Sequence, residues 1–184
     1  KTGKIWLNKN LGASRVATSP TDEASYGDLY QWGRAADGHE KRNAVTTTTI
    51  SKTTNPWHSY FICSDKSPWD WCEPQNDNLW QGVNGENNPC PKGYRIPTAA
   101  EWEAEMATWS SEGSQGAFNS PLKLPVAGFR NYSDGSLNTV GSHGNYWSST
   151  VNGMNARNLY FYSSNATMDG NNRAYGSSVR CLKD

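Results

Sequence analysis

Charge is scarce and balanced in this chain of 184 residues. Only 18% of the residues are charged, and the 17 Lys and Arg residues equal the 17 Asp and Glu residues. A chain without net charge and without a basic run has nothing that would follow a phosphate backbone, so nucleic-acid binding is disfavoured. No apolar stretch approaches the roughly 20 residues that cross a bilayer, and the first ten residues, KTGKIWLNKN, hold no signal-peptide core. We therefore expect no membrane span in this chain.

Motifs for nucleotide, metal and covalent chemistry are also missing from the sequence. It has no Gly-rich phosphate loop, and its low aliphatic content argues against long helices and a Rossmann sheet. His39, His58 and His143 lack the spacing of metal ligands, and no set of Ser, His and Asp is recognisable as a catalytic triad. The sequence thus predicts a protein that is not an enzyme and uses no metal or cofactor.

Cysteine is sparse, with four residues and no CxxC pair, so a zinc site is not expected. An even number permits two disulfides in three pairings, but free thiols are equally consistent with the number alone. The spacing suggests a local pair, Cys63 with Cys72, and a long-range pair, Cys90 with Cys181.

Aromatic and small polar residues are plentiful instead, including nine Trp and nine Tyr. Trp and Tyr bury a large area while keeping one polar group. The length suits one domain that buries about two-thirds of its unfolded surface. Composition and length together predict a loop-rich fold with short strands.

The last fifth of the chain, from Gly144 to Cys181, carries the clearest strand pattern. Leu159 and Phe161 alternate with Asn158, Tyr160 and Tyr162, and period-two alternation is typical of a half-buried strand. Similar runs span 145–150 and 177–182, and Asn and Gly residues between the runs, from 152 to 155 and from 165 to 172, are turn formers. We expect an antiparallel meander with one face in the core and one polar face free to bind.

Two helices are predicted. Asp22 or Ser25 would cap a short amphipathic helix that ends near Gly38 and carries Tyr26, Leu29, Tyr30 and Gly33 on one side. Thr98 and Glu101 form a capping box ahead of a helix that places Trp102, Met106 and Trp109 on one face.

The remaining segments complete an α+β pattern. Short strands are expected at 5–7 and at 122–126, the second followed by a turn at Asp134 and Gly135. Residues 39–89 have no regular pattern, and we interpret them as a long loop insert held by a satellite core that contains Trp57, Phe61, Trp69, Trp71 and Trp80. Helices outside a small, mostly antiparallel sheet are the expected arrangement.

Six ordered blocks carry a family resemblance: WLNKNLG, YGDLYQWGRA, CPKGYRIPTAAEW, LPVAGFR, YWSST and SVRC. In this order they resemble the Fibrobacter succinogenes major paralogous domain, which is similar to the C-type lectin and formylglycine-generating-enzyme fold. The resemblance covers nearly all of residues 1–184 except 39–89. It implies a single C-type lectin-like domain, in which the N-terminal strand pairs near the C-terminal one and Cys90 is bridged to Cys181.

Within that family, residues 147–181 look like the variable region of a diversity-generating retroelement target protein. There a reverse transcriptase randomises template adenines, so that AAC codons for Asn become codons for Tyr, Asp, Ser, Gly, Thr or Ala. The residues of these types that we expect on the variable, ligand-binding surface are Asn152, Asn155, Asn158, Tyr160, Tyr162, Asn165, Thr167, Asp169, Gly170, Asn171, Tyr175 and Ser177. Met154 departs from the pattern, because Met cannot arise from AAC in this way.

The resemblance implies a receptor-type protein that binds a protein or glycan ligand and is secreted or displayed on a prokaryotic cell or virion. Tyr, Asn, Ser and Gly also match antibody paratope chemistry. The alternatives are a lectin-like domain of the same fold that is not diversified, a formylglycine-generating oxidase, and a calcium-dependent lectin. The oxidase would need a reactive cysteine pair at a copper site, and the calcium lectin would use the segment Glu73, Pro74, Gln75, Asn76 and Asp77.

Overall fold

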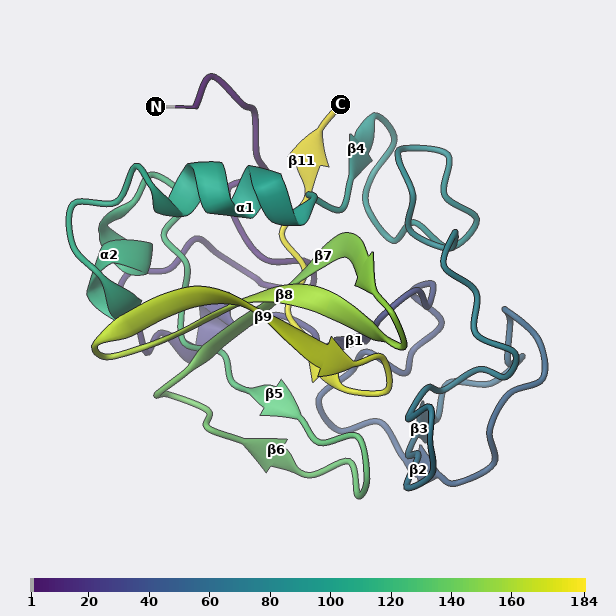
Figure 1. Ribbon diagram of the computed structural model, residues 1–184. Coiled ribbons are helices and arrows are strands. Elements are labelled where there is room, and N and C mark those ends of the chain that lie inside the picture. The colour runs from purple at the N-terminus through teal and green to yellow at the C-terminus, as the bar shows by residue number, and fades with distance from the viewer. Residues whose placement is uncertain (1) are drawn as a thin grey trace.

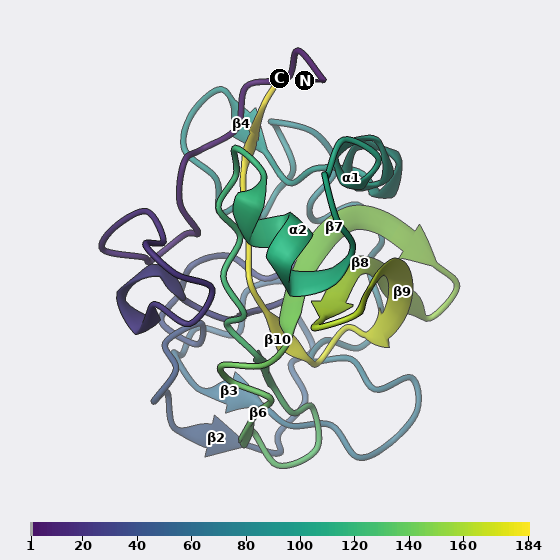
Figure 2. The same ribbon diagram turned by 90° about the vertical axis from the view of Figure 1, so that its left-hand side faces the viewer.

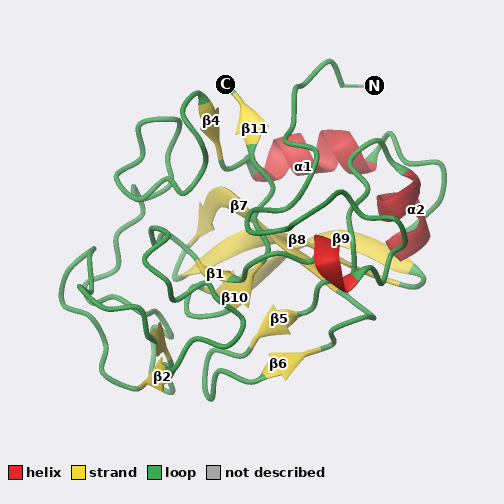
Figure 3. Cartoon of the chain, turned by 180° about the vertical axis from the view of Figure 1, so that it is seen from behind, coloured by secondary structure: helices red, strands yellow, loops and turns green. Residues whose placement is uncertain are grey.

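The computed structural model describes residues 2–184 as two α-helices and many short strands joined by long loops (Figure 1, Figure 3). The helices are α1 (Ala99–Met106) and α2 (Gly113–Asn119), and a 3-10 turn, η1, spans Glu23–Ser25. The strands are β1 (Tyr30–Gln31), β2 (Thr46–Thr47), β3 (Phe61–Ile62), β4 (Tyr94–Arg95), β5 (Phe129–Arg130), β6 (Leu137–Asn138), β7 (Gly144–Asn152), β8 (Asn155–Tyr162), β9 (Asn165–Asn172), β10 (Gly176–Ser177) and β11 (Leu182–Lys183). The expected α+β class with much loop is confirmed. Within the described residues, no helix is long and apolar enough to cross a bilayer.

Strands β7, β8 and β9 form an antiparallel meander, the sheet with the longest strands. The sequence predicted the first two strands, but it assigned 165–172 to turns, and this was wrong. Asn, Asp and Gly in β9 adopt extended backbone because β8 offers a complete ladder, while Ala166 and Met168 gain contacts with a hydrophobic cluster. The single strand expected at 177–182 is wrong: Ser177 belongs to β10 and Leu182 to β11, and these two short strands lie in different sheets outside the meander.

Segments distant in sequence are joined by the other sheets. One sheet has the order β1-β10-β5-β6, a second pairs β11 with β4, and a third pairs β2 with β3 in parallel. Near the chain ends, Leu7 N–H donates to Cys181 O at 2.9 Å and Lys183 N–H donates to Ile5 O at 2.8 Å. The expected pairing of the N-terminal and C-terminal segments is confirmed, and Figure 2 shows both ends together.

Helix α1 begins as its sequence predicts. The Thr98 hydroxyl accepts from Glu101 N–H at 3.3 Å, and the Glu101 carboxylate accepts from Thr98 N–H at 2.8 Å, so both halves of the capping box are present. Trp102 is buried, and Met106 and Trp109 are partly buried against the same cluster. The helix thereby covers one face of the meander (Figure 1).

The helix expected from 22 to 38 is wrong. After the short 3-10 turn, Gly27 has φ +69°, and a Cβ there would overlap the Leu11 carbonyl, so the chain turns away from helical geometry. Tyr30 instead pairs with Ser177 in a sheet. The three- and four-residue spacing of buried side chains here comes from a folded loop.

The strand expected at 122–126 is also wrong. Leu122, Leu124 and Val126 are buried, as their spacing of two residues predicted. Their backbone is irregular, however, and the strand of this region is β5, which begins at Phe129. The turn at Asp134 and Gly135 does connect β5 with β6.

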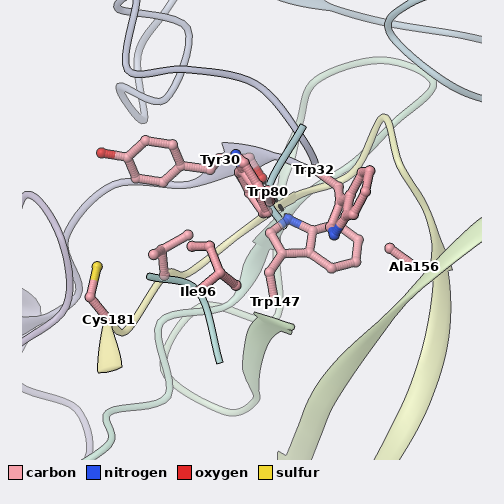
Figure 4. Packing of buried hydrophobic residues seen from close by; sticks show 8 residues of the cluster. Tyr30, Trp32, Trp80, Ile96, Trp147, Ala156 and Cys181 are labelled. Atoms are coloured by element: carbon pink, nitrogen blue, oxygen red, sulfur yellow. Dashed lines mark hydrogen bonds between the residues drawn. The ribbon is translucent and has the colours of Figure 1, made fainter. Parts of the chain in front are cut away.

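Two large hydrophobic clusters lie on opposite faces of the meander. Trp102, Leu159 and Phe161 belong to the cluster under the helices, whereas Trp147 and Ala156 belong to the cluster shown in Figure 4. In the second cluster Trp147 Nε1 donates to Tyr30 O at 2.7 Å, and Trp32 Nε1 donates to Ser148 O at 2.8 Å. The buried indoles are thus hydrogen-bonded, and they tie the meander to the loops around it.

The 39–89 segment is held by a satellite core, as expected. Ile62, Trp71, Cys72 and Leu79 form a separate buried cluster, and Phe61 is also fully buried. Trp80 is fully buried too, but it packs with Trp32 and Trp147 in the cluster shown in Figure 4, so its assignment to the satellite core was wrong. Trp69 is partly buried. Trp57 does not belong to this core, because its side chain is 84% exposed.

The cysteines follow one expected pairing and contradict the other. Cys90 and Cys181 form a disulfide, with their Cα atoms 5.9 Å apart. Cys63 and Cys72 are both buried free thiols, so the local pairing was wrong. Each thiol belongs to the packing of the loop insert, where Cys72 Sγ lies 3.3 Å from Thr53 O.

Candidate ligand-binding surface

The meander separates buried from accessible side chains along β8. Leu159 and Phe161 are fully buried against the helices, whereas Tyr160 and Tyr162 are partly exposed on the opposite face. The expected alternation of these four residues is confirmed. This arrangement lets the accessible residues change while the buried residues hold the fold.

The same division continues in β9. Thr167 and Asp169 are exposed, whereas Ala166 and Met168 pack against the cluster beneath the helices. Cross-strand pairing sets Tyr160 opposite Thr167, so the accessible side chains of the two strands are contiguous. We define the outward face as the group Tyr160, Tyr162, Thr167, Asp169 and Asn171.

Aromatic stacking orders one side of this face. The His143 ring is stacked against Tyr160 and Tyr162, with centroid distances of 5.7 Å and 5.5 Å, and the two Tyr rings lie 5.8 Å apart. Burial, together with the nearby Tyr162 and Asp169, raises the pKa of Tyr160. Its hydroxyl therefore stays protonated and available as a donor at neutral pH.

A cleft of about 110 Å³ opens beside this face. It is lined by Phe129, Asn145, Tyr160, Asp169, Asn171, Tyr175 and Ser177. Strand β10 pairs with β5, and Gly128 bridges Gly144 at the start of β7, so these pairings bring β5 and β10 against the meander. Five of the residues expected on the variable surface thereby meet in one place.

Tyr175 forms the wall of the cleft opposite the meander. Its ring packs edge-on against Phe129 at 5.3 Å and against Tyr132 at 4.8 Å. Burial and the nearby Tyr132 raise the pKa of Tyr175. The cleft is thus lined by one aromatic residue from the meander, Tyr160, and by Tyr175 and Phe129 from outside it.

Several expected residues do not belong to the outward face. Asn158 is 0% exposed, because it lies on β8 between Ala156 and Tyr160 and opposite the buried Trp147, so its assignment to an accessible surface was wrong. Ser177 is also buried, although it lines the cleft. Asn165, in contrast, pairs with Tyr162 and is exposed, as expected, at the end of this face.

Asn152, Asn155 and Gly170 form a second location near the turn between β7 and β8. Asn152 pairs with Asn155, and Gly170 pairs with Arg157, which lies on the face of β8 that carries Leu159. Strand alternation therefore turns Asn155 and Gly170 away from the outward face. The expected set is divided between the two faces of the sheet.

Met154 lies at the tip of this turn and is half-exposed. Side chains of Gln75 and Arg173 donate hydrogen bonds to the backbone of the turn. Gln75 Nε2 donates to Met154 O at 3.0 Å and to the buried Asp70 carboxylate at 2.9 Å. Arg173 Nη2 donates to Gly153 O at 3.0 Å and to Asp77 at 2.6 Å. The turn is thereby held by side chains from outside the meander.

The segment that resembles a calcium motif has its carboxylates in ion pairs. Glu73 lies 2.6 Å from Lys52, and Asp77 lies 2.6 Å from Arg173. Binding calcium there would require both pairs to break, so the geometry disfavours a calcium site.

A different acidic group surrounds His39. Ligand-type atoms of Asp37, His39 and Glu40 lie within 4.8 Å of one another. His39 Nε2 accepts from Gln31 N–H at 3.0 Å, and its Nδ1 lies 2.7 Å from Asp37. Burial lowers the pKa of His39 to about 4. Both ring nitrogens are therefore occupied by structural hydrogen bonds.

Phe129, Asn145 and His143 were missed by the sequence reasoning. Asn145 lies two residues before Trp147 in an expected strand, so alternation would have placed both on the same face. Phe129 and His143 carry no local signal, because their positions depend on the pairing of β5 with β10 and on the bridge between Gly128 and Gly144.

No family model matches this chain, and neither the curated proteins nor the solved structures include a detectable match.

Proposed function

We propose that this chain is a C-type lectin-like receptor protein whose outward face and adjoining cleft bind varying protein or glycan targets. The residues of this surface vary between gene copies because a diversity-generating retroelement changes their codons. The binding positions are those of the outward face together with Tyr175; Asn158 and Ser177 belong to the scaffold. The proposed role involves no catalysis.

The observation that carries the proposal is the alternation of burial along two paired strands. Leu159, Phe161 and Met168 point into a hydrophobic cluster, while Tyr160 and Asp169 lie on the opposite face. Exposed substitutions change stability by only about 0.5 kcal/mol. A surface of this kind tolerates diversification without loss of the fold.

The residue types on the face also support recognition. Tyr provides rigid contact area with few rotatable bonds, and Asn, Asp and Thr provide adaptable hydrogen bonds. Tyr160 and Tyr162 are further ordered by their stacking on His143. Ordered side chains lose less entropy when a partner binds.

Three features support the proposed fold type. The chain ends pair with each other, Cys181 is fixed to Cys90, and a three-stranded meander carries the face. These agree with what the six sequence blocks imply.

Oxidase chemistry is less well supported by the thiols of this chain. Cys181 is bonded to Cys90, and burial raises the pKa of Cys72 to about 11 and also raises the pKa of Cys63. A reactive thiolate needs the opposite shift.

The first test is to sequence the DNA that flanks the gene. The proposal expects a reverse transcriptase and a template repeat that differs from the gene at adenines. Sibling genes should differ most at Tyr160, Tyr162, Thr167, Asp169 and Asn171 and least at Leu159 and Phe161. Equal divergence at the two sets, without a template repeat, would contradict diversification.

A second test is experimental selection. The five outward-face positions are randomised in a displayed library, and a control library randomises Thr46, Thr48, Thr49, Asp65 and Lys66, which are exposed elsewhere. Target-specific binders should emerge from the face library and not from the control library. If both libraries yield target-specific binders equally often, the outward face has no special role in recognition.

A further inference from the structure

The cleft beside the outward face presents one carboxylate, two side-chain amides, and hydroxyl and aromatic groups to a ligand. Of the described residues that line it, Asp169 alone carries a formal charge. Asp169 Oδ1 accepts from Gly170 N–H at 2.8 Å, and among residues 2–184 nothing donates to its Oδ2. One carboxylate oxygen is therefore free at the rim.

Asn171 contributes a second acceptor. Its Nδ2 donates to the buried Asn158 Oδ1 at 3.0 Å, and this bond fixes the orientation of the amide. The Asn171 Oδ1 atom is left to accept from a ligand.

Asn145 contributes a third acceptor on the floor of the cleft. The residue is 3% exposed, and its Nδ2 is buried with no partner among the described residues. The side-chain atom that remains for the cleft is Oδ1. The enclosed Nδ2 is a donor and takes no part in binding a group that only donates, so Asn145 contributes its Oδ1 atom alone.

No cationic side chain is among the described residues that line the cleft. Arg130 follows Phe129 in β5, but its guanidinium donates to Gly135 O at 2.7 Å and to Ala44 O at 2.6 Å. The same guanidinium lies over the Phe61 ring at 4.3 Å. The guanidinium of Arg130 thus makes its contacts away from the cleft.

We propose that the cleft binds an arginine side chain presented by a partner protein. A guanidinium has five N–H donors and no acceptor, which matches the three acceptor groups, and its plane stacks on aromatic rings such as Tyr160 and Tyr175. A volume of about 110 Å³ is far below the roughly 300 Å³ of the smallest typical small-molecule pockets, and it suits a single side chain. The inference rests on the proposed recognition function and names the chemistry of the partner.

The test uses the full chain and two small probes, N-acetylarginine amide and its neutral counterpart N-acetylcitrulline amide. Backbone amide signals are followed by NMR as each probe is added. Arginine should give saturable shifts at Asp169, Gly170 and Asn171, and citrulline should bind about tenfold more weakly because the charge-assisted hydrogen bonds are lost. N-acetyllysine amide should bind more weakly than arginine, because an ammonium does not reproduce the planar fork.

Two matched variants test whether the Asp169 carboxylate is responsible for arginine binding. Asp169→Asn keeps the shape and the Oδ1 bond but removes the charge, and it should lower arginine affinity about tenfold. Asp65→Asn makes the same change at an exposed site outside the cleft and should leave affinity unchanged.

The inference is overturned if citrulline binds as well as arginine, if Asp169→Asn has no effect, or if no saturable shift occurs. It is also overturned if N-acetylglucosamine, and not arginine, shifts the cleft signals. These outcomes leave the proposed function standing, because the template repeat and the library selection test it without reference to arginine.

Discussion

The side-chain amide of Asn171 donates a 3.0 Å hydrogen bond to the side-chain carbonyl of Asn158 across the hairpin of β8 and β9. The two residues have the same type and lie in the same expected variable region, but Asn158 is fully buried and Asn171 is only partly buried. The boundary between scaffold and binding surface therefore runs between these two side chains.

The first prediction compares Asn158→Tyr with Asn171→Tyr, the same single-adenine codon change at two depths. Tyr at 158 overfills a closed position and should lower the free energy of unfolding by about 1–3 kcal/mol or more. Tyr at 171 reaches solvent and should cost less, about 1 kcal/mol, because only the hydrogen bond to Asn158 Oδ1 is lost. Urea unfolding of the two variants measures both values. Equal costs would mean that position 158 is as permissive as position 171.

A second prediction concerns Gly144, whose cross-strand partner is Phe161. A Cβ at Gly144 would overlap the Phe161 ring, so Gly144→Ala should destabilise the fold by about 1–3 kcal/mol. In a Phe161→Leu background the cost should shrink, which gives a coupling energy of about 0.5–3 kcal/mol in a double-mutant cycle. Gly170→Ala, where a Cβ meets only Asn152 Nδ2 at 3.7 Å, is the control and should be close to neutral. Additive effects of the two changes would rule out the steric explanation.

A third prediction concerns the disulfide, which joins residues 91 positions apart. Replacing both Cys90 and Cys181 with Ala should lower the free energy of unfolding by about 4 kcal/mol, because the unfolded chain regains the entropy of a long loop. Cys63→Ala removes a single buried thiol and should cost less. Thiol titration of the unreduced, denatured chain should detect Cys63 and Cys72 alone. Detection of all four thiols there would show that the bridge does not form.

The fourth prediction concerns pH. Burial raises the pKa of Asp70 to about 6, above its ordinary value of 3.8. Between pH 4 and pH 6 the folded state binds more protons at Asp70 than the unfolded state, so the contribution of Asp70 to stability falls as pH rises through this window. The Asp70→Asn variant lacks this dependence.

The measurement is the free energy of unfolding of Asp70→Asn minus that of the unmodified chain. This difference should rise by roughly 2 kcal/mol from pH 4 to pH 6 and level off above about pH 7. Asp65→Asn, at an exposed position, is the control for the loss of one carboxylate elsewhere on the surface. A flat profile for Asp70→Asn would mean that the Asp70 carboxyl has the same pKa in both states.

Local signals in the sequence predicted local structure well. The capping box of Thr98 and Glu101 lies within four residues, and it starts α1 as expected. The alternation around Leu159 and Phe161 likewise predicted β8 and its buried face. In each case the residues that decide the structure are neighbours in the chain.

Local signals failed where distant segments decide the backbone. The spacing of Tyr26, Leu29 and Tyr30 resembles a helix, but Tyr30 pairs with Ser177 from the other end of the chain. The Asn and Gly residues of β9 favour turns, but the free edge of β8 makes them a strand. Tertiary pairing outweighed intrinsic preference at both places.

Neighbouring residues are enough to specify that outward and inward residues alternate in this sheet, because a strand places successive side chains on opposite faces. They also specify the helix start at Thr98. Only the tertiary structure decided which outward residues reach solvent, since Asn158 is covered by packing that the strand does not encode. The cleft likewise exists only because β5 and β10 bring Phe129 and Tyr175 against the meander, and no local pattern specifies contacts between residues so far apart in the chain.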